Sequence, residues 1–554
     1  MEGRNLMSNL ENFNNIYANL SESSYSRRPK NFPPKSNSSK EQFFDFSKDY
    51  INTETKLIEI KGGTNLPNDG IVYLQPDPTI KTSVTPKTYQ TPQMNGGYEA
   101  IQYDETVTQK GLLTDDKAGF NAYFVTDTPK LSKDTKQTYL AIRGSDAAGI
   151  DTLNDWIAND ANFALTNSYI PQAKLANKAI AEKIKEINKY ADPNAKLDIT
   201  GHSLGTMVSA QAVAQLYHAE HKAFETIGEV VLFDGPDVSQ SLKNMGLSDK
   251  EIKAVGEKVT YYVNPFDMVS MLNRTAPYEE QFGTVNVIVP LRFNTTFDIT
   301  SSHDFGEFQI SASGKPLSAS KTFHPEMLTA GHKLAKLLDT TISKVEGTGI
   351  KGITTGVILT ALSGGVGALM ALGISAVDAK AIYDGFNQSY KDIIASAKKK
   401  SKAWNVEHIP DYQKRIQCTS GSQKVELRAE LLQSVAQDAM LQSEEFVSEV
   451  KTIIASALED VQKEIIQGVQ AANNVAQYLD YWEVNALLSE FNISNFWDTG
   501  IENSTNIAAE AFQTEIEEFS ATLMKVSQNI EEVDRQGASG FNNLMTETQV
   551  NWGK

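Results

Sequence analysis

A serine between two glycines is the most chemically informative feature of the chain. Gly201–Gly205 reads Gly-His-Ser-Leu-Gly, which matches the pattern G-x-S-x-G around a nucleophilic serine. Serine is a weak nucleophile at neutral pH, so it needs a histidine as general base and a carboxylate that orients the histidine. Ser203 is therefore a candidate nucleophile if the chain also supplies these two groups.

The residues around this pattern predict the turn that such a serine requires. Lys196–Thr200 alternates apolar and polar residues like a short strand, and Thr206–Tyr217 places apolar residues on one helical face. A strand, a sharp turn and a helix form the context of a nucleophile elbow, where glycines avoid clashes beside the strained serine. An ordinary glycine-rich turn between a strand and a helix is the structural alternative.

The chain has seven histidines, which makes the search for the general base short. In α/β-hydrolases the acid and then the histidine follow the serine along the chain. The histidines that fit this order and lie in the same predicted domain are His303, His324 and His332. For the acid, the preferred candidate is Asp267, which follows a strand-like run. The competing acids after the preceding strand-like run are Asp234 and Asp237.

Acyl transfer also needs N–H donors for the charge that develops on the carbonyl oxygen. The backbone N–H of Leu204 directly follows the nucleophile, and Ser145 lies at the end of an earlier strand-like run, where a second donor belongs. The next stretch is short and amphipathic. Its apolar residues are either core or, in a lipase, a lid over the site, and they are Ile150, Leu153, Trp156 and Ile157.

Length, cysteine use and charge narrow the class of protein. A chain of 554 residues is too long for one hydrophobic core. The single cysteine, Cys418, excludes an internal disulfide and a cysteine-based zinc site, and we expect no metal and no other cofactor. The net charge is −18, and most of it comes from residues 421–554, which contain 7 Lys and Arg residues and 22 Asp and Glu residues. This acidic balance argues against nucleic acid as a partner.

The order of patterns predicts an α/β domain followed by long helices. Residues 1–50 have the composition of a flexible arm, and residues 51–340 alternate strand-like and helix-like runs. Residues 345–385 form a glycine-rich apolar helical segment. Its uncharged stretch, residues 352–377, is expected to be buried or conditionally inserted in a membrane rather than permanently spanning one. Residues 386–554 predict an acidic helical domain that binds partners.

Motifs at four places, in the same order along the chain, resemble those of the class 3 (fungal-type) lipase family. They are Ile142–Ser145 with Asn154–Ile157, Ile199–Gly205, Phe233–Val238 and Val263–Val269. This resemblance covers roughly residues 95–335. It implies an α/β-hydrolase fold with Ser203 as nucleophile, Asp267 as acid, Ser145 and Leu204 as oxyanion donors and residues 146–160 as the lid. The context of His303 best resembles that of the family's histidine, and His324 is the second choice.

The whole chain resembles the type VII secretion lipase effectors of Gram-positive bacteria (the TslA type), in which an LXG-like helical targeting domain lies at the C-terminus. This resemblance implies a secreted phospholipase A1 toxin that acts on membrane phospholipid, binds small α-helical secretion partner proteins and is neutralised by an immunity lipoprotein. The first 30 residues lack the apolar core of a signal peptide, so we expect export that is independent of one.

Three other functions stay open. The same scaffold serves thioesterases and peptidases. A toxin could insert residues 352–377 into a membrane, with the hydrolase domain secondary. A secretion or adhesion scaffold could carry an inactive hydrolase domain.

Overall fold

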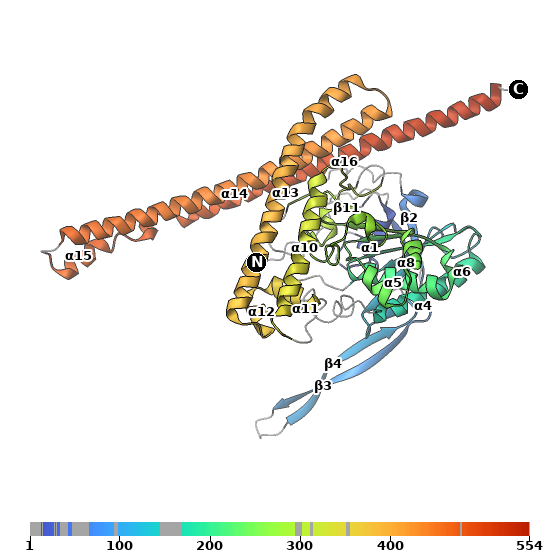
Figure 1. Cartoon of the computed structure of the whole chain (residues 1–554), viewed down its shortest axis with the longest axis horizontal. Coiled ribbons are helices and arrows are strands. Elements are labelled where there is room, and N and C mark those ends of the chain that lie inside the picture. Colours follow the sequence, from blue (N-terminus) through green and yellow to red (C-terminus); the bar gives the residue numbers. More distant parts are fainter. Residues whose placement is uncertain are drawn as a thin grey trace. The chain divides into compact units, whose positions relative to one another are not determined.

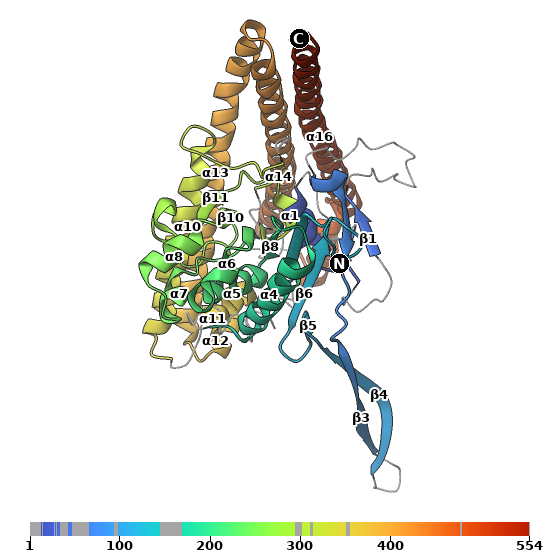
Figure 2. The same ribbon diagram turned by 90° about the vertical axis from the view of Figure 1, so that its right-hand side faces the viewer.

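In the computed structural model the chain divides into two compact units. One unit comprises Met1–Trp404 with Gln528–Lys554, and the other comprises Asn405–Ser527. Figure 1 and Figure 2 show their helices and strands. The structure describes residues 13, 15–26, 28, 30–33, 42–46, 66–92, 98–144, 169–293, 302–310, 314–350, 355–476 and 479–552.

An 11-stranded sheet forms the centre of the first unit among the described residues. The strands β7 to β11 pair in chain order and run parallel, which brings their C-terminal ends to one edge of the sheet. β6 joins β7 in antiparallel fashion, and β2 joins β6. The strands are β1 (Gln42–Asp45), β2 (Ile71–Leu74), β3 (Lys81–Pro92), β4 (Tyr98–Lys110), β5 (Thr114–Asp115), β6 (Phe120–Thr126), β7 (Gln137–Ile142), β8 (Lys196–His202), β9 (Ile227–Phe233), β10 (Val259–Val263) and β11 (Thr284–Val287).

Helices cover the parallel part of the sheet, which explains why β8 and β9 are buried along most of their length. α5 packs against β7, β8 and β9, and α4 packs against α5. The described α-helices of this unit are α1 (Ile16–Ser23), α4 (Pro171–Tyr190), α5 (Leu204–Ala219), α6 (His221–Phe224), α7 (Ser239–Asn244), α8 (Asp249–Gly256), α10 (Pro325–Gly347), α11 (Thr355–Gly364), α12 (Val366–Ala371), the first part of α13 (Ala376–Cys418) and the last part of α16 (Thr499–Trp552).

The strands β3 and β4 form a long two-stranded ribbon. They pair in antiparallel fashion from Lys81 opposite Lys110 to Pro92 opposite Tyr98, with a register shift after Lys87. Figure 1 and Figure 2 show the ribbon extending away from the rest of the sheet. The sequence analysis did not predict this ribbon, whose strands mix polar residues with scattered apolar ones such as Val84, Ile101 and Val107.

The N-terminal segment differs from the predicted flexible arm over residues 1–50. Within it α1 packs on β7 and β8, with Ile16 and Leu20 in one core cluster and Ala18 in another. Asn15 caps the helix by accepting the N–H of Ala18 at 2.9 Å. The polar residues that follow suggested an arm, yet the apolar face of this one short helix is enough to anchor the segment on the sheet.

Of the apolar stretch at residues 352–377, the described part from Thr355 onward is divided among several helices. α11 and α12 are separated at Gly365, which has a φ of 82°, and α12 is separated from α13 near Gly373, which has a φ of 93°. Ile358 and Leu362 are buried, whereas Val377 is exposed. No helix among the described residues is long and apolar enough to cross a membrane.

The second unit consists of long helices. Its main elements are α14 (Ser422–Val475), α15 (Tyr481–Leu488) and the first part of α16 (Thr499–Trp552). α14 and α16 lie against each other, because the rings of Phe446 and Phe512 are 5.3 Å apart and Lys451 pairs with Glu510 at 2.8 Å. This unit has the long acidic helices that the sequence predicts, but the first unit runs on to Trp404, well beyond the predicted domain boundary at residue 340.

Candidate active site

The serine of the G-x-S-x-G pattern occupies a sharp turn between β8 and α5. β8 ends at His202, α5 begins at Leu204, and Ser203 between them has a φ of 59° and a ψ of −129°. A non-glycine residue with positive φ is strained, and such strain persists only where the surrounding structure imposes it. Here the N–H of Ser203 donates to the carbonyl oxygen of Phe233 at the end of β9. The strand, turn and helix predicted from the sequence are therefore present.

The glycines of the pattern are required by close contacts. A Cβ atom on Gly205 would lie 2.3 Å from the carbonyl oxygen of Ile142, at the end of β7. A Cβ atom on Gly201 would lie 2.7 Å from the carbonyl oxygen of Gly205. Both distances are shorter than a Cβ can approach a backbone oxygen, so any side chain here would push α5 away from the sheet.

His303 is the histidine that the structure brings to Ser203. Its Nε2 lies 2.8 Å from the Oγ of Ser203, and its Nδ1 lies 2.8 Å from the Oδ2 of Asp267. Because a carboxylate only accepts hydrogen bonds, Nδ1 carries the proton and Nε2 is free to accept the hydroxyl proton of Ser203. All three side chains are buried.

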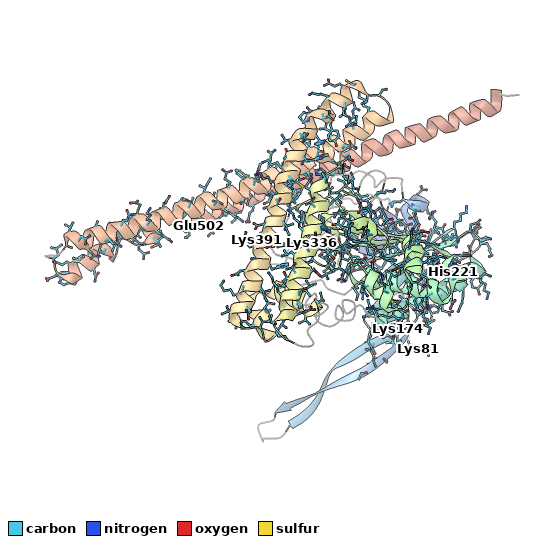
Figure 3. The ribbon with its side chains drawn as sticks, in the orientation of Figure 1. Lys81, Lys174, His221, Lys336, Lys391 and Glu502 are labelled. Atoms are coloured by element: carbon cyan, nitrogen blue, oxygen red, sulfur yellow. The ribbon has the colours of Figure 1, made fainter. Side chains whose placement is uncertain are left out.

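The other candidate histidines lie elsewhere. His324 precedes α10, where its Nδ1 lies 2.8 Å from the Oε1 of Glu326 and its ring lies 4.0 Å from that of Trp404. His332 is half-buried within α10. His221, which was not a candidate, is exposed on α6, and Figure 3 labels it at the periphery of the side chains around the sheet.

Asp267 follows β10 in a turn that surrounds its carboxylate with donors. Its Oδ1 accepts the N–H of Val269 at 3.0 Å, and its Oδ2 accepts the N–H of Ser270 at 2.8 Å and the hydroxyl of the same serine. Asp267 has no exposed surface. These bonds hold one carboxylate oxygen toward His303, which is the role of the acid in a catalytic triad.

The two competing acids have other surroundings. Asp237 accepts the hydroxyl of the serine two residues later, which is a local turn contact. Asp234 is fully buried, its Oδ1 accepts the N–H of Asn264 at 2.8 Å, and the same oxygen lies 3.0 Å from the Oγ of Ser270. Burial, and then the charge of Asp267, raise the pKa of Asp234 well above its usual range. Through the N–H of Asn264 and the side chain of Ser270, Asp234 supports the turn that carries Asp267.

The two histidines beside the nucleophile differ in their pKa. Burial lowers the pKa of His303, but the charge of Asp267 and the hydrogen bond to it outweigh that effect, and the net shift is upward. Burial, followed by the positive charges of His303 and Arg28, lowers the pKa of His202 well below its usual value. His202 therefore stays neutral, whereas His303 is able to take up a proton near neutral pH.

The start of α5 supplies one candidate donor for an oxyanion. Leu204 is the first residue of the helix, so its N–H has no partner inside the helix and lies at the positive end of the helix dipole. The other predicted donor, Ser145, lies outside the described residues, and so does the predicted lid with Ile150, Leu153, Trp156 and Ile157. The described part of the chain contains no group of three or more His, Cys, Asp or Glu residues that could hold a metal ion.

Sequence reasoning missed two residues near the site, Tyr25 and Arg28. Both belong to the segment that was expected to be a flexible arm, and they contact His202 and Asp304, the neighbours of Ser203 and His303. The apolar residues that α1 buries, such as Ile16 and Leu20, could have indicated that this segment is anchored on the domain, but not that it reaches the site.

Comparison with known families agrees with the fold. A model of the family described as alpha/beta hydrolase of unknown function (DUF900) matches residues 97–288. This segment includes Ser203 and Asp267 and ends before His303. Searches of curated proteins and of solved structures found no match. The first unit thus contains an α/β-hydrolase domain, long helices follow it, and hydrolase activity is the general function that the family match supports.

Proposed function

We propose that the protein is a serine carboxylic-ester hydrolase of the lipase type. The observation that carries this proposal is the continuous hydrogen-bonded series from Ser203 through His303 to Asp267, at a strained turn between a parallel strand and a helix. The same constellation activates serine on several unrelated folds, so its geometry identifies the chemistry more reliably than the fold does.

The mechanism follows from the geometry. His303 Nε2 takes the hydroxyl proton as Ser203 Oγ attacks the carbonyl carbon of the ester, and the N–H of Leu204 donates to the oxyanion, with Ser145 as the second donor. His303 then gives its proton to the leaving alcohol, and an acyl-enzyme remains. Water, deprotonated by the same histidine, hydrolyses the acyl-enzyme and restores the serine. Asp267 stabilises the positive charge on His303 in both steps.

We propose phospholipid as the substrate class, with phospholipase A1 activity. The support is the resemblance of four motifs to class 3 lipases and the apolar residues of the predicted lid, which suit a lipid interface. The experiment is mass spectrometry of the products formed from mixed bacterial phospholipids. The wild type should release fatty acid and a lysophospholipid acylated only at the second position, and Ser203→Ala should release neither while keeping its circular dichroism spectrum.

Other results would favour the alternative functions. Cleavage of thioesters or peptides, with phospholipids untouched, would identify a different hydrolase on this scaffold. Leakage of vesicles made from non-hydrolysable ether lipids, caused equally by Ser203→Ala, would favour a membrane-inserting toxin. Absence of hydrolysis of any substrate by the wild type would favour a secretion scaffold.

We further propose that the helical second unit binds small α-helical partner proteins during type VII export. Its support is a set of exposed apolar residues on an acidic surface, which suits partner helices with an apolar stripe flanked by basic residues. These exposed residues include Ile453, Ile466, Trp482, Phe496, Ile501 and Ile507. Secretion without a signal peptide, action on a target membrane and an immunity lipoprotein are proposed from the resemblance to type VII effectors.

Co-expression with such partner proteins and size-exclusion chromatography would test this binding. Ile453→Glu and Ile507→Glu should each abolish co-elution, because a buried charge without a partner is costly in a helix interface. Phe43→Glu, at an exposed apolar residue of the first unit, should leave co-elution intact. Unchanged co-elution of both helix variants would refute the proposed surface.

A further inference from the structure

The N-terminal segment contacts the residue that follows the general base. Arg28 donates from Nη1 to Oδ2 of Asp304 at 3.1 Å and from Nη2 to Oδ1 at 2.5 Å. The side chains are only 12% and 9% exposed, so water competes little for these bonds. A two-point contact between a guanidinium and a carboxylate fixes the orientation of both groups as well as their separation.

A second contact from the same segment leads to the carbonyl group of His303. The Nε2 of His202 lies 2.8 Å from this carbonyl oxygen, so Nε2 carries the proton of the neutral ring and donates it. The Nδ1 of His202 then accepts the hydroxyl of Tyr25 at 3.0 Å. The Tyr25 hydroxyl oxygen in turn accepts the N–H of Gly144 at 3.1 Å. Through His202, therefore, Tyr25 helps to fix the backbone of His303.

The loop that carries His303 has one further contact of this kind. The side-chain amide of Asn264, just after β10, donates to the carbonyl oxygen of Ser302 at 2.8 Å. Each of the residues 302–304 is thus held by one contact, from Asn264, His202 and Arg28 in turn. The contacts to residues 303 and 304 depend on the N-terminal segment, the first through Tyr25 and the second directly. Arg28 and Asp304 are separated by 276 positions in the chain.

We propose that Arg28 is a positioning residue for His303, and that the segment carrying Tyr25 and Arg28 is a structural part of the active site. This inference rests on the proposed ester hydrolase function. The distance of 2.8 Å between His303 Nε2 and Ser203 Oγ allows proton transfer, and a displacement of about 1 Å can lower the rate about 100-fold. Loss of the two-point contact should therefore lower kcat more than it changes KM.

The experiment compares variants that leave neither Arg28 nor Asp304 as the lone charge of their two-point contact; Glu22, whose Oε1 lies 3.8 Å from Nη1 of Arg28, is unchanged in all of them. Arg28→Lys keeps the positive charge but loses the planar fork, and the double variant Arg28→Gln with Asp304→Asn removes both charges together. The control is Arg292→Lys, because Arg292 also pairs with a buried carboxylate of the same loop, Glu307, but through Nε at 3.1 Å rather than through two Nη atoms. Thermal unfolding establishes that each variant is folded, kcat and KM are measured on a soluble ester, and a fluorophosphonate probe reports the reactivity of Ser203.

We expect Arg28→Lys and the double variant to lose about 10- to 100-fold in kcat and in the rate of labelling, with KM changed less than threefold. Arg292→Lys should stay within threefold of the wild type. Wild-type kcat and wild-type labelling in the folded Arg28→Lys and double variants would overturn this inference but not the proposed function. An equal loss of kcat and labelling in Arg292→Lys would have the same consequence. A wild-type protein that neither hydrolyses esters nor is labelled at Ser203 would overturn the proposed function, and the inference with it.

Discussion

Replacing Asp267 with asparagine removes one charge from the triad and keeps its shape. The structure predicts which way the new amide lies. Three donors converge on Oδ2, from the N–H and hydroxyl of Ser270 and from Nδ1 of His303, whereas only the N–H of Val269 reaches Oδ1. The asparagine oxygen should therefore take the Oδ2 position, and its NH₂ group should face Val269.

This orientation sets the size of the effect. His303 keeps the proton on Nδ1 in this variant. In a serine protease, the corresponding substitution gives the wrong histidine tautomer and lowers kcat about 10⁴-fold; we expect that this effect is avoided here. What is lost is the charge that stabilises the imidazolium, and we expect kcat to fall about 10²- to 10³-fold. The unpaired N–H of Val269 should also lower the free energy of unfolding by about 1–3 kcal/mol.

The pH dependence gives a second measure of the same change. His303 must be neutral to act as a base, so activity is lost as the pH falls through its pKa. Asp267 holds this pKa above the usual value against the effect of burial. In Asp267→Asn the acidic limb of the kcat/KM profile should therefore move to lower pH.

The assay is hydrolysis of a soluble ester between pH 5 and pH 9. Asp237→Asn is the matched control, since Asp237 also follows a strand of the sheet but contacts neither His303 nor Ser203 in the described structure. Wild-type kcat in Asp267→Asn, or an acidic limb that does not move, would refute the assigned role of Asp267.

Three further predictions concern folding and pH. Gly205→Ala should prevent folding, because its Cβ would lie 2.3 Å from the carbonyl oxygen of Ile142; circular dichroism and gel filtration would show this, and a soluble native variant would contradict it. Tyr390→Phe removes a 2.9 Å hydrogen bond to the carbonyl of Phe266, and thermal unfolding should show a loss of about 1–3 kcal/mol; an unchanged melting temperature would contradict it. Burial raises the pKa of Asp198 from 3.8 to about 6, so the stability that its protonated form provides is complete below pH 3.8 and is lost as the pH rises through 6. Urea unfolding should show that this loss, up to about 3 kcal/mol, is absent from Asp198→Asn, and equal pH dependence in both proteins would contradict the prediction.

The position of the nucleophile was predictable from the sequence because its requirements are local. Gly201 and Gly205 are needed within five residues of each other, and the strand and helix on either side have clear periodicities. Asp267 could not be separated from Asp234 by pattern alone, since each follows a buried strand. The contact with His303 at 2.8 Å makes the distinction, and it depends on how two distant loops meet.

The role of the N-terminal segment could not be predicted for the same reason. Arg28 lies in a polar stretch typical of flexible arms, and its partner is 276 positions away. The composition of a segment indicates whether it can bury enough apolar surface to fold by itself. It does not indicate whether a distant part of the chain forms a buried ion pair with it. The extension of the first unit to Trp404 was missed because α13 continues as one helix across the division between the units.

The contact between Tyr390 and the carbonyl of Phe266, directly before Asp267, has a consequence for synthesis of the protein. A ribosome that has released the chain as far as residue 288 has made the nucleophile and the acid but not the base. The brace from α13 follows only about a hundred residues later. The triad is thus complete only after more than half of the chain has been synthesised, because His303 is the last of its three residues, and the contact from Tyr390 is added later still.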